Sequence, residues 1–220
     1  MSFNIEHWLN LYTDAVKKQF GNRIWFIGLQ GSYGRGEATD TSDIDVVLIL
    51  DSLSYQDLST YSQLLDTLPN RDKICGFVSG RKELEQWEKS DLFQFCHDTT
   101  EIVGSLDDIL QIIDKDDVKQ AVHMGACNIY HACVHNAVHE KSMDNLKAIY
   151  KSAVFVIQAI VYLQRGSFVK RQTELGDYLE PEDRRILDGW LTLKRGDEES
   201  FSVLSENIMN WSSKWLVHRF

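Results

Sequence analysis

The chain has 220 residues, of which 43% are hydrophobic and 25% charged, and its formal net charge is −10. This is ordinary globular composition, sufficient for one large domain or two small ones. The acidic balance argues against a non-specific nucleic-acid binder, which usually presents a basic surface. It is compatible with a nucleotide that is held through a metal ion.

Targeting signals are not apparent in the sequence. The first 20 residues lack the basic stretch and following apolar segment of a signal peptide. The longest apolar segment, residues 153–163, is too short and too interrupted to span a bilayer. The four cysteines show no paired framework and read as reduced thiols. We therefore expect a cytoplasmic protein that does not bind membranes.

The first half of the chain mixes helical and strand patterns. A helical stripe predicts a helix over residues 5–20, ended by Gly21 and Asn22. Apolar, β-branched and aromatic runs predict three strands, and polar stretches with helical spacing lie between them. The expected strands are 24–29, 44–50 and 73–78, and the expected helices are 54–68 and 83–88, with 93–103 as helix and then strand.

From about residue 109 the patterns are helical only. The predicted helices cover residues 116–139, 144–165, 170–179, 181–194 and 198–218. The fold class is therefore expected to be α+β, with a small mixed-sheet domain over 1–108 and an all-helical bundle domain over 109–220. No Gly/Ser-rich linker marks the boundary.

The stretch between the first two strands carries the chemistry. Gly31 and Ser32 turn the chain into a short helix, where backbone N–H groups and a hydroxyl can approach a phosphate. Asp43 and Asp45 stand two residues apart at the start of a strand, so their side chains share one face. Paired carboxylates suit Mg²⁺, which takes hard oxygen ligands together with substrate phosphates.

The segment "GSYGRGEATDTSDIDVVL" resembles the signature of the polymerase-β-type nucleotidyltransferase superfamily. The resemblance lies in Gly31-Ser32, ten intervening residues, and Asp43-Ile44-Asp45 followed by apolar residues. A small α/β domain followed by helices is similar, more loosely, to the aminoglycoside and lincosamide nucleotidyltransferases. The resemblance implies that Gly31 and Ser32 bind the phosphates of a nucleoside triphosphate. It also implies that Asp43 and Asp45 are catalytic ligands of one or two Mg²⁺ ions.

The family usually supplies a third carboxylate from the next strand, and "DKICGFVSG" has no acid at its centre. Asp72 at the start of that strand is one candidate, although a turn residue is the more ordinary interpretation. Asp98 and Glu140 are others, the substrate could supply the base, or catalysis could be lost. The sequence leaves the third acid unassigned.

Basic residues of the second half are candidates for phosphate binding. Lys147 and Lys151 are one helical turn apart, and Lys170 and Arg171 lie near the start of a predicted helix. Drug-modifying relatives carry a basic residue in a similar stretch, which favours Lys170 as nucleotide-binding. A solvated surface position is an equally good interpretation of each.

A ladder of histidines and one cysteine recurs every four residues: His123, Cys127, His131, His135 and His139. On a helix only neighbouring members can share a face. Zinc binding by His131 and His135 is one hypothesis. The alternatives are a surface or cleft-lining stripe beside a core formed by the apolar residues of the same helix, among them Ala126, Ile129, Tyr130, Cys133 and Val138.

Three functions follow from the resemblance. The first is transfer of a nucleoside monophosphate, AMP from Mg-ATP, to a hydroxyl of a small acceptor such as an aminoglycoside-like antibiotic, with release of pyrophosphate. The second is a protein nucleotidylyltransferase of the antitoxin kind. The third is an inactive nucleotide-binding module. The acceptor, the nucleobase and the choice between monomer and homodimer stay open.

Overall fold

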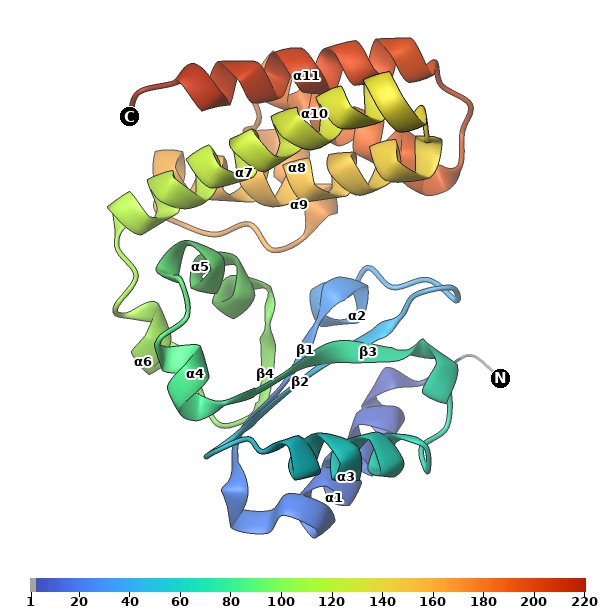
Figure 1. Cartoon of the computed structure of the whole chain (residues 1–220), viewed down its shortest axis with the longest axis vertical. Coiled ribbons are helices and arrows are strands. Elements are labelled where there is room, and N and C mark those ends of the chain that lie inside the picture. Colours follow the sequence, from blue (N-terminus) through green and yellow to red (C-terminus); the bar gives the residue numbers. More distant parts are fainter. Residues whose placement is uncertain (1–2) are drawn as a thin grey trace. The chain divides into compact units, whose positions relative to one another are not determined.

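A computed structural model describes residues 3–220 of the chain (Figure 1). Contacts between Cα atoms divide the chain into two units, Met1–Ile112 and Ile113–Phe220. The expected domains, 1–108 and 109–220, stay a prediction.

The first unit is built on a four-stranded sheet. Its strands are β1 (Ile24–Gln30), β2 (Ile44–Leu50), β3 (Ile74–Gly80) and β4 (Thr100–Val103), in the order β3-β2-β1-β4. β1 runs antiparallel to β2 and β4, whereas β2 and β3 are parallel. This confirms the expected α+β class with a mixed sheet.

One face of the sheet is covered by α1 (Ile5–Phe20) and α3 (Tyr55–Leu65) (Figure 1). Alternation along β2 directs Ile44, Val46 and Leu48 to this face, where they are fully or almost fully buried. The core against them is formed by apolar side chains of both helices, which are Trp8, Tyr12, Val16, Phe20, Tyr61 and Leu65. The residues between them on β2, including Asp45, therefore point to the opposite face.

Short helices follow the strands of the first unit. They are α2 (Gly31–Arg35), α4 (Arg81–Glu85), α5 (Lys89–Asp98) and α6 (Asp107–Leu110), with 3₁₀ turns at Gly21–Arg23 and Arg71–Lys73. The ring of Phe77 on β3 meets those of Trp87 and Phe95 edge-on, with centroids 5.6 and 5.0 Å away. This aromatic contact holds α5 against β3.

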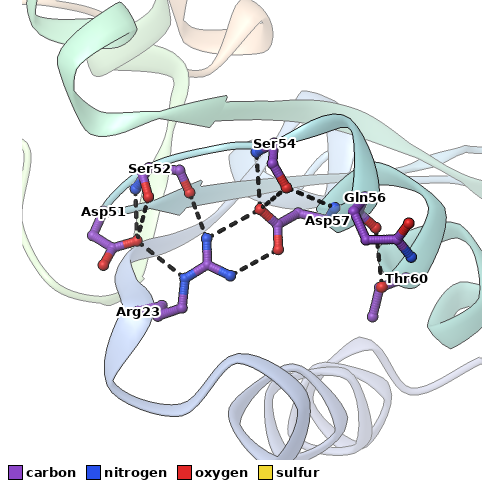
Figure 2. A network of polar contacts seen from close by, with 7 residues as sticks. All are labelled: Arg23, Asp51, Ser52, Ser54, Gln56, Asp57 and Thr60. Atoms are coloured by element: carbon purple, nitrogen blue, oxygen red, sulfur yellow. Dashed lines mark hydrogen bonds and ion pairs between the residues drawn. The ribbon is translucent and has the colours of Figure 1, made fainter.

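An arginine joins the ends of three elements of the first unit (Figure 2). The guanidinium of Arg23, just before β1, donates to both carboxylate oxygens of Asp57 at 2.7 and 3.0 Å. It also donates to the Ser52 carbonyl at 2.8 Å. Asp57 in turn completes a capping box with Ser54 at the start of α3. Hydrogen bonds from Arg23 and Ser54 hold the pKa of the Asp57 carboxyl well below its usual range.

The second unit is helical throughout its regular structure. Its long helices are α7 (Lys115–His135), α8 (Met143–Arg165), α10 (Pro181–Arg195) and α11 (Phe201–Val217). α7 packs on α8 and α11, and α10 packs on the same two helices. The tryptophans of α10 and α11 lie in this core, where Trp211 and Trp215 both donate their indole N–H to the buried carboxylate of Asp183.

Two helix predictions were wrong in part. Residues 170–179 form only α9 (Gln172–Leu175) and a 3₁₀ turn, Gly176–Tyr178. The buried amide of Gln158 accounts for this, because it donates to the carbonyls of Val169 and Lys170 at 2.9 and 3.1 Å and fixes that segment as a loop. The helix expected to end at 139 instead becomes a π-helical turn over Asn136–Glu140.

One described helix, α8, is long and apolar enough to cross a membrane by length and composition, with a window of mean hydropathy 1.5. The apolar segment expected from the sequence was shorter than this helix. Of that window, 61% is buried within the structure. Packing of α7 and α10 against α8 gives it the surroundings of a core helix.

Candidate active site

The turn after β1 brings Gly31 against Asp45. Gly31 has a φ of +66°, a backbone conformation that side chains disfavour. A Cβ placed there would lie 1.9 Å from the Oδ2 atom of Asp45 and 2.9 Å from its Cγ atom. Only glycine can occupy this position without moving the carboxylate. The structure thus places two of the predicted site residues in direct proximity.

Ser32 lies in the short turn formed by α2. Its carbonyl accepts a hydrogen bond from the Glu37 backbone N–H at 2.8 Å, and the Tyr33 carbonyl accepts from Gly36 at 3.1 Å. The loop that follows is closed by Ser42, whose hydroxyl accepts from the Thr39 N–H at 2.9 Å. These bonds fix both ends of the segment between the predicted phosphate-binding turn and the acid pair.

Asp43 and Asp45 occupy the start of β2. Asp43 precedes the strand by one residue and is exposed, whereas Asp45 is its second residue and half-buried. Across the sheet, Asp45 is in register with Gln30 on β1 and with Cys75 on β3. Residues in register on neighbouring strands point to the same face. The residue beside the acid pair on the next strand is therefore an exposed cysteine.

The candidates for a third acid do not occupy that position. Asp72 is exposed in the 3₁₀ turn that precedes β3. Asp98 does fold inward, but its carboxylate accepts two hydrogen bonds from Arg35, both at 2.9 Å. Glu140 belongs to the second unit and accepts from the amide of Asn145. Asp98 as the third site acid stays a prediction, and in the structure a buried arginine donates to both of its oxygens.

The donor set fits a magnesium ion that is shared with a nucleotide. Over residues 3–220, no group of three or more His, Cys, Asp or Glu side chains is arranged to hold a metal ion by itself. Asp43 and Asp45 can supply two hard oxygen ligands, and Mg²⁺ commonly takes one or two carboxylates and completes its shell with phosphates and water. The backbone of Gly31 approaches the Asp45 carboxylate closely, because glycine has no Cβ at this position.

The predicted basic residue, Lys170, lies in the loop between α8 and α9 and is half-buried. Its backbone position is set by Gln158, as described above. Lys147 and Lys151 lie on α8 and Arg171 forms an ion pair with Glu174 at 3.1 Å. A nucleotide-binding role for Lys170 stays a prediction.

The histidine ladder follows the exposed side of α7 and ends with His139 in the π-helical turn after it. Within the ladder, the ring centroids of His131 and His135 are 6.3 Å apart, and those of His135 and His139 are 4.9 Å apart. Ala126, Ile129 and Cys133 of the same helix are buried, as expected of core. The core assignment was wrong for Tyr130 and Val138, which are 37% and 62% exposed. The ladder thus has the surroundings of a surface stripe.

Sequence reasoning missed Arg35. This side chain is only 6% exposed, and besides Asp98 it contacts the Glu37 carboxylate at 3.3 Å. The one local signal was an arginine inside a glycine-rich turn. Its partner Asp98 lies 63 residues away, so no local pattern could have joined them.

The glycine turn and the acid pair lie within a region that matches a known protein family. Residues 10–123, more than half of the chain, match the nucleotidyltransferase domain family. The chain belongs to this family. The match contains the glycine turn, the acid pair and all four strands of the sheet.

Individual relatives are more distant. A protein of Methanocaldococcus jannaschii, provisionally named as a protein adenylyltransferase, is 44% identical over 54 residues, which are 24% of this chain and 51% of that protein. The chain thus spans about half the length of this curated relative. A spectinomycin adenyltransferase from Enterococcus faecialis, solved with ATP and spectinomycin, aligns with a TM-score of 0.63 and 13% identity. That alignment covers 97% of this chain and 99% of the other, and it supports the fold.

Proposed function

We propose that this nucleotidyltransferase moves AMP from Mg-ATP to a hydroxyl group of a small acceptor and releases pyrophosphate. The observation that carries the proposal is the contact of the Gly31 backbone with the Asp45 carboxylate. In this contact the backbone of the glycine turn, which suits phosphates, lies directly beside the Asp45 carboxylate, which suits Mg²⁺.

The residues of the chain have separable roles in this proposal. Gly31 and Ser32 hold the phosphates, through backbone N–H groups and the serine hydroxyl. Asp43 and Asp45 hold Mg²⁺ and so fix the direction in which the α-phosphate faces the acceptor. When bound, the metal neutralises the triphosphate and polarises the phosphoryl group that is attacked. Lys170, on the second unit, is proposed as a further nucleotide-binding residue through its positive charge.

An antibiotic of the aminoglycoside kind is the acceptor class that we propose. The fold similarity to a spectinomycin adenyltransferase extends over both units of the chain, including the helical part. The net charge of −10 also favours a cationic acceptor. In this proposal the protein acts in the cytoplasm and confers resistance.

Two observations favour other functions. The 54-residue match to a provisionally named protein adenylyltransferase favours AMP transfer to a protein side chain. The cysteine in register with Asp45, where a third acid was expected, favours nucleotide binding without turnover.

Pyrophosphate release from ATP and Mg²⁺ in the presence of an aminoglycoside and spectinomycin panel tests these functions together. We expect release with at least one drug, and a loss of at least about 100-fold in Asp43→Asn or Asp45→Asn, since each removes a charged metal ligand. A +AMP mass on a co-expressed protein, without release on any drug, indicates the second function. ATP binding by calorimetry with neither product indicates the third. Unchanged rates in both asparagine variants contradict the metal-site assignment.

A further inference from the structure

The turn that carries Gly31 and Ser32 packs against the end of α5 and the start of β4. The Thr100 hydroxyl donates to the Gly34 carbonyl at 2.8 Å. A Cβ at Gly34 would lie 2.5 Å from the carbonyl oxygen of Leu29, so the turn sits close against β1. Just before the turn, the Gln30 amide donates to the Thr99 hydroxyl at 2.8 Å.

The charged residues at this contact, Arg35, Asp98 and Glu37, are buried. Arg35, the last residue of α2, directs one terminal nitrogen to both oxygens of Asp98, the last residue of α5. The side chains of Arg35, Asp98 and Glu37 are only 6%, 11% and 8% exposed. Buried ion pairs are weak sources of net stability, because desolvation offsets their attraction, but they impose a defined geometry. Their energy alone therefore does not explain why this group is retained in the interior.

We propose that Arg35 and Asp98 are positioning residues for the nucleotide. By fixing the C-terminal end of α2 to the end of α5, they set the direction in which the backbone N–H groups of Gly31 and Ser32 face the phosphates. Neither residue contacts the substrate. The role rests on the proposed function of the turn, and it deepens that function by naming what holds the turn in place.

The same unit provides a matched control at the other end of β1. Arg23 and Asp57 form a two-point ion pair of similar length, with one terminal nitrogen on each carboxylate oxygen. This pair ties β1 to the start of α3 and lies beyond the opposite end of the strand from Gly31 (Figure 2). Asp57→Asn removes the same charge as Asp98→Asn, so it reports what loss of an ion pair does to this unit without disturbing the turn.

Two measurements separate positioning from stability. The first is the dissociation constant of Mg-ATP, by calorimetry at a temperature where every variant is folded. We expect Asp98→Asn to raise it at least fivefold and Asp57→Asn to leave it within twofold. The second is hydrogen exchange without ligand at the amides of Gly36 and Glu37, which close the turn. We expect Asp98→Asn to speed their exchange at least tenfold, and Asp57→Asn to leave it unchanged.

An apolar replacement provides the decisive variant: Arg35→Met with Asp98→Leu, made together with Glu37→Gln so that no buried carboxylate is left without Arg35. If the ion pair only stabilises the unit, the apolar variant recovers both the thermal midpoint and the Mg-ATP affinity of the wild type. That result overturns the proposal. If the ion pair positions the turn, the midpoint recovers while binding and slow exchange do not. Equal effects of Asp98→Asn and Asp57→Asn also overturn it. A wild-type protein that binds no ATP contradicts the proposed function, and the exchange experiment then still decides whether these residues hold the turn.

Discussion

At the scale of single residues, the site contains a contact at which any added side chain would displace the Asp45 carboxylate. Gly31 combines a positive φ with an immediate neighbour, the carboxylate of Asp45. The two constraints can be separated experimentally, because Gly21 has a similar φ of +55° and no atom within 4 Å of where a Cβ would stand.

We predict that Gly31→Ala and Gly21→Ala each cost about 1 to 3 kcal/mol of unfolding free energy, through backbone strain. Only Gly31→Ala should also weaken Mg-ATP binding, by at least about tenfold or 1.4 kcal/mol, because its methyl group displaces the Asp45 carboxylate, the proposed metal ligand. Urea unfolding and calorimetry measure the two effects. Equal ATP affinity in both variants would contradict the role of the contact.

The cysteine beside Asp45 leads to a second prediction at this scale. Cys75 is exposed and in register with Asp45, so an aspartate there adds a carboxylate to the same face. We predict that Cys75→Asp lowers the Mg²⁺ concentration for half-maximal pyrophosphate release by roughly threefold or more, since added ligand charge strengthens cation binding. Cys75→Asn has the same shape without the charge and should leave it unchanged. Identical behaviour of the two variants would show that this position does not face the metal.

At the scale of elements, the helices behind the sheet are joined by a buried hydrogen bond. The hydroxyls of Tyr12 on α1 and Tyr61 on α3 are 2.8 Å apart, and both side chains are buried. Either hydroxyl left alone would be an unsatisfied polar group in the core. This bond, together with the stacking of Trp8 on Tyr12, sets how α1 lies against α3 and the sheet.

A double-mutant cycle tests this coupling. We predict that Tyr12→Phe and Tyr61→Phe each cost about 1 to 2 kcal/mol, because each leaves the other hydroxyl without its partner. The double variant should cost clearly less than the sum, since it removes both polar groups. Urea unfolding of the four proteins measures the coupling, and strictly additive costs would contradict it.

At the scale of the whole molecule, buried acids that stay protonated make the protein sensitive to alkali. Burial raises the pKa of Tyr61 from 10.0 to about 12, and burial with the nearby Glu101 charge raises that of Cys96 from 9.0 to about 12. Burial also raises the pKa of Tyr12 and Tyr150. Above about pH 9 the unfolded chain releases these protons before the folded protein does. Their contribution to stability is therefore complete below pH 9 and is lost as the pH rises toward 12.

We predict that the unfolding free energy, measured by urea at pH 8 to 11, falls steadily above pH 9. Tyr61→Phe should reduce the slope between pH 10 and 11, because it removes one of the titrating groups. Tyr55→Phe is the control, since this side chain is 88% exposed. A slope that is the same in both variants, or no slope at all, would contradict the assignment.

The fold was predictable where the pattern is local. Three of the strands and the first helix were predicted within two residues of their ends, because each is bounded by glycine or polar residues and buries one regular face. The mixed sheet followed by helices was also predictable from the change of pattern near residue 109. The loop that replaces the helix expected over 170–179 was not predictable. The Gln158 side chain on α8 donates to the carbonyls of Val169 and Lys170, and local propensity cannot anticipate that contact.

The sequence alone determined the family, through Gly31-Ser32 and Asp43-Ile44-Asp45, because those residues act over a short stretch of chain whose spacing can be read directly. Only the tertiary structure decided what surrounds them. Strand pairing placed Cys75 beside Asp45, and the packing of α5 brought Asp98 into an ion pair with Arg35. These contacts join residues that are dozens of positions apart in the sequence. The register of the strands depends on how the buried faces of strands and helices fit together.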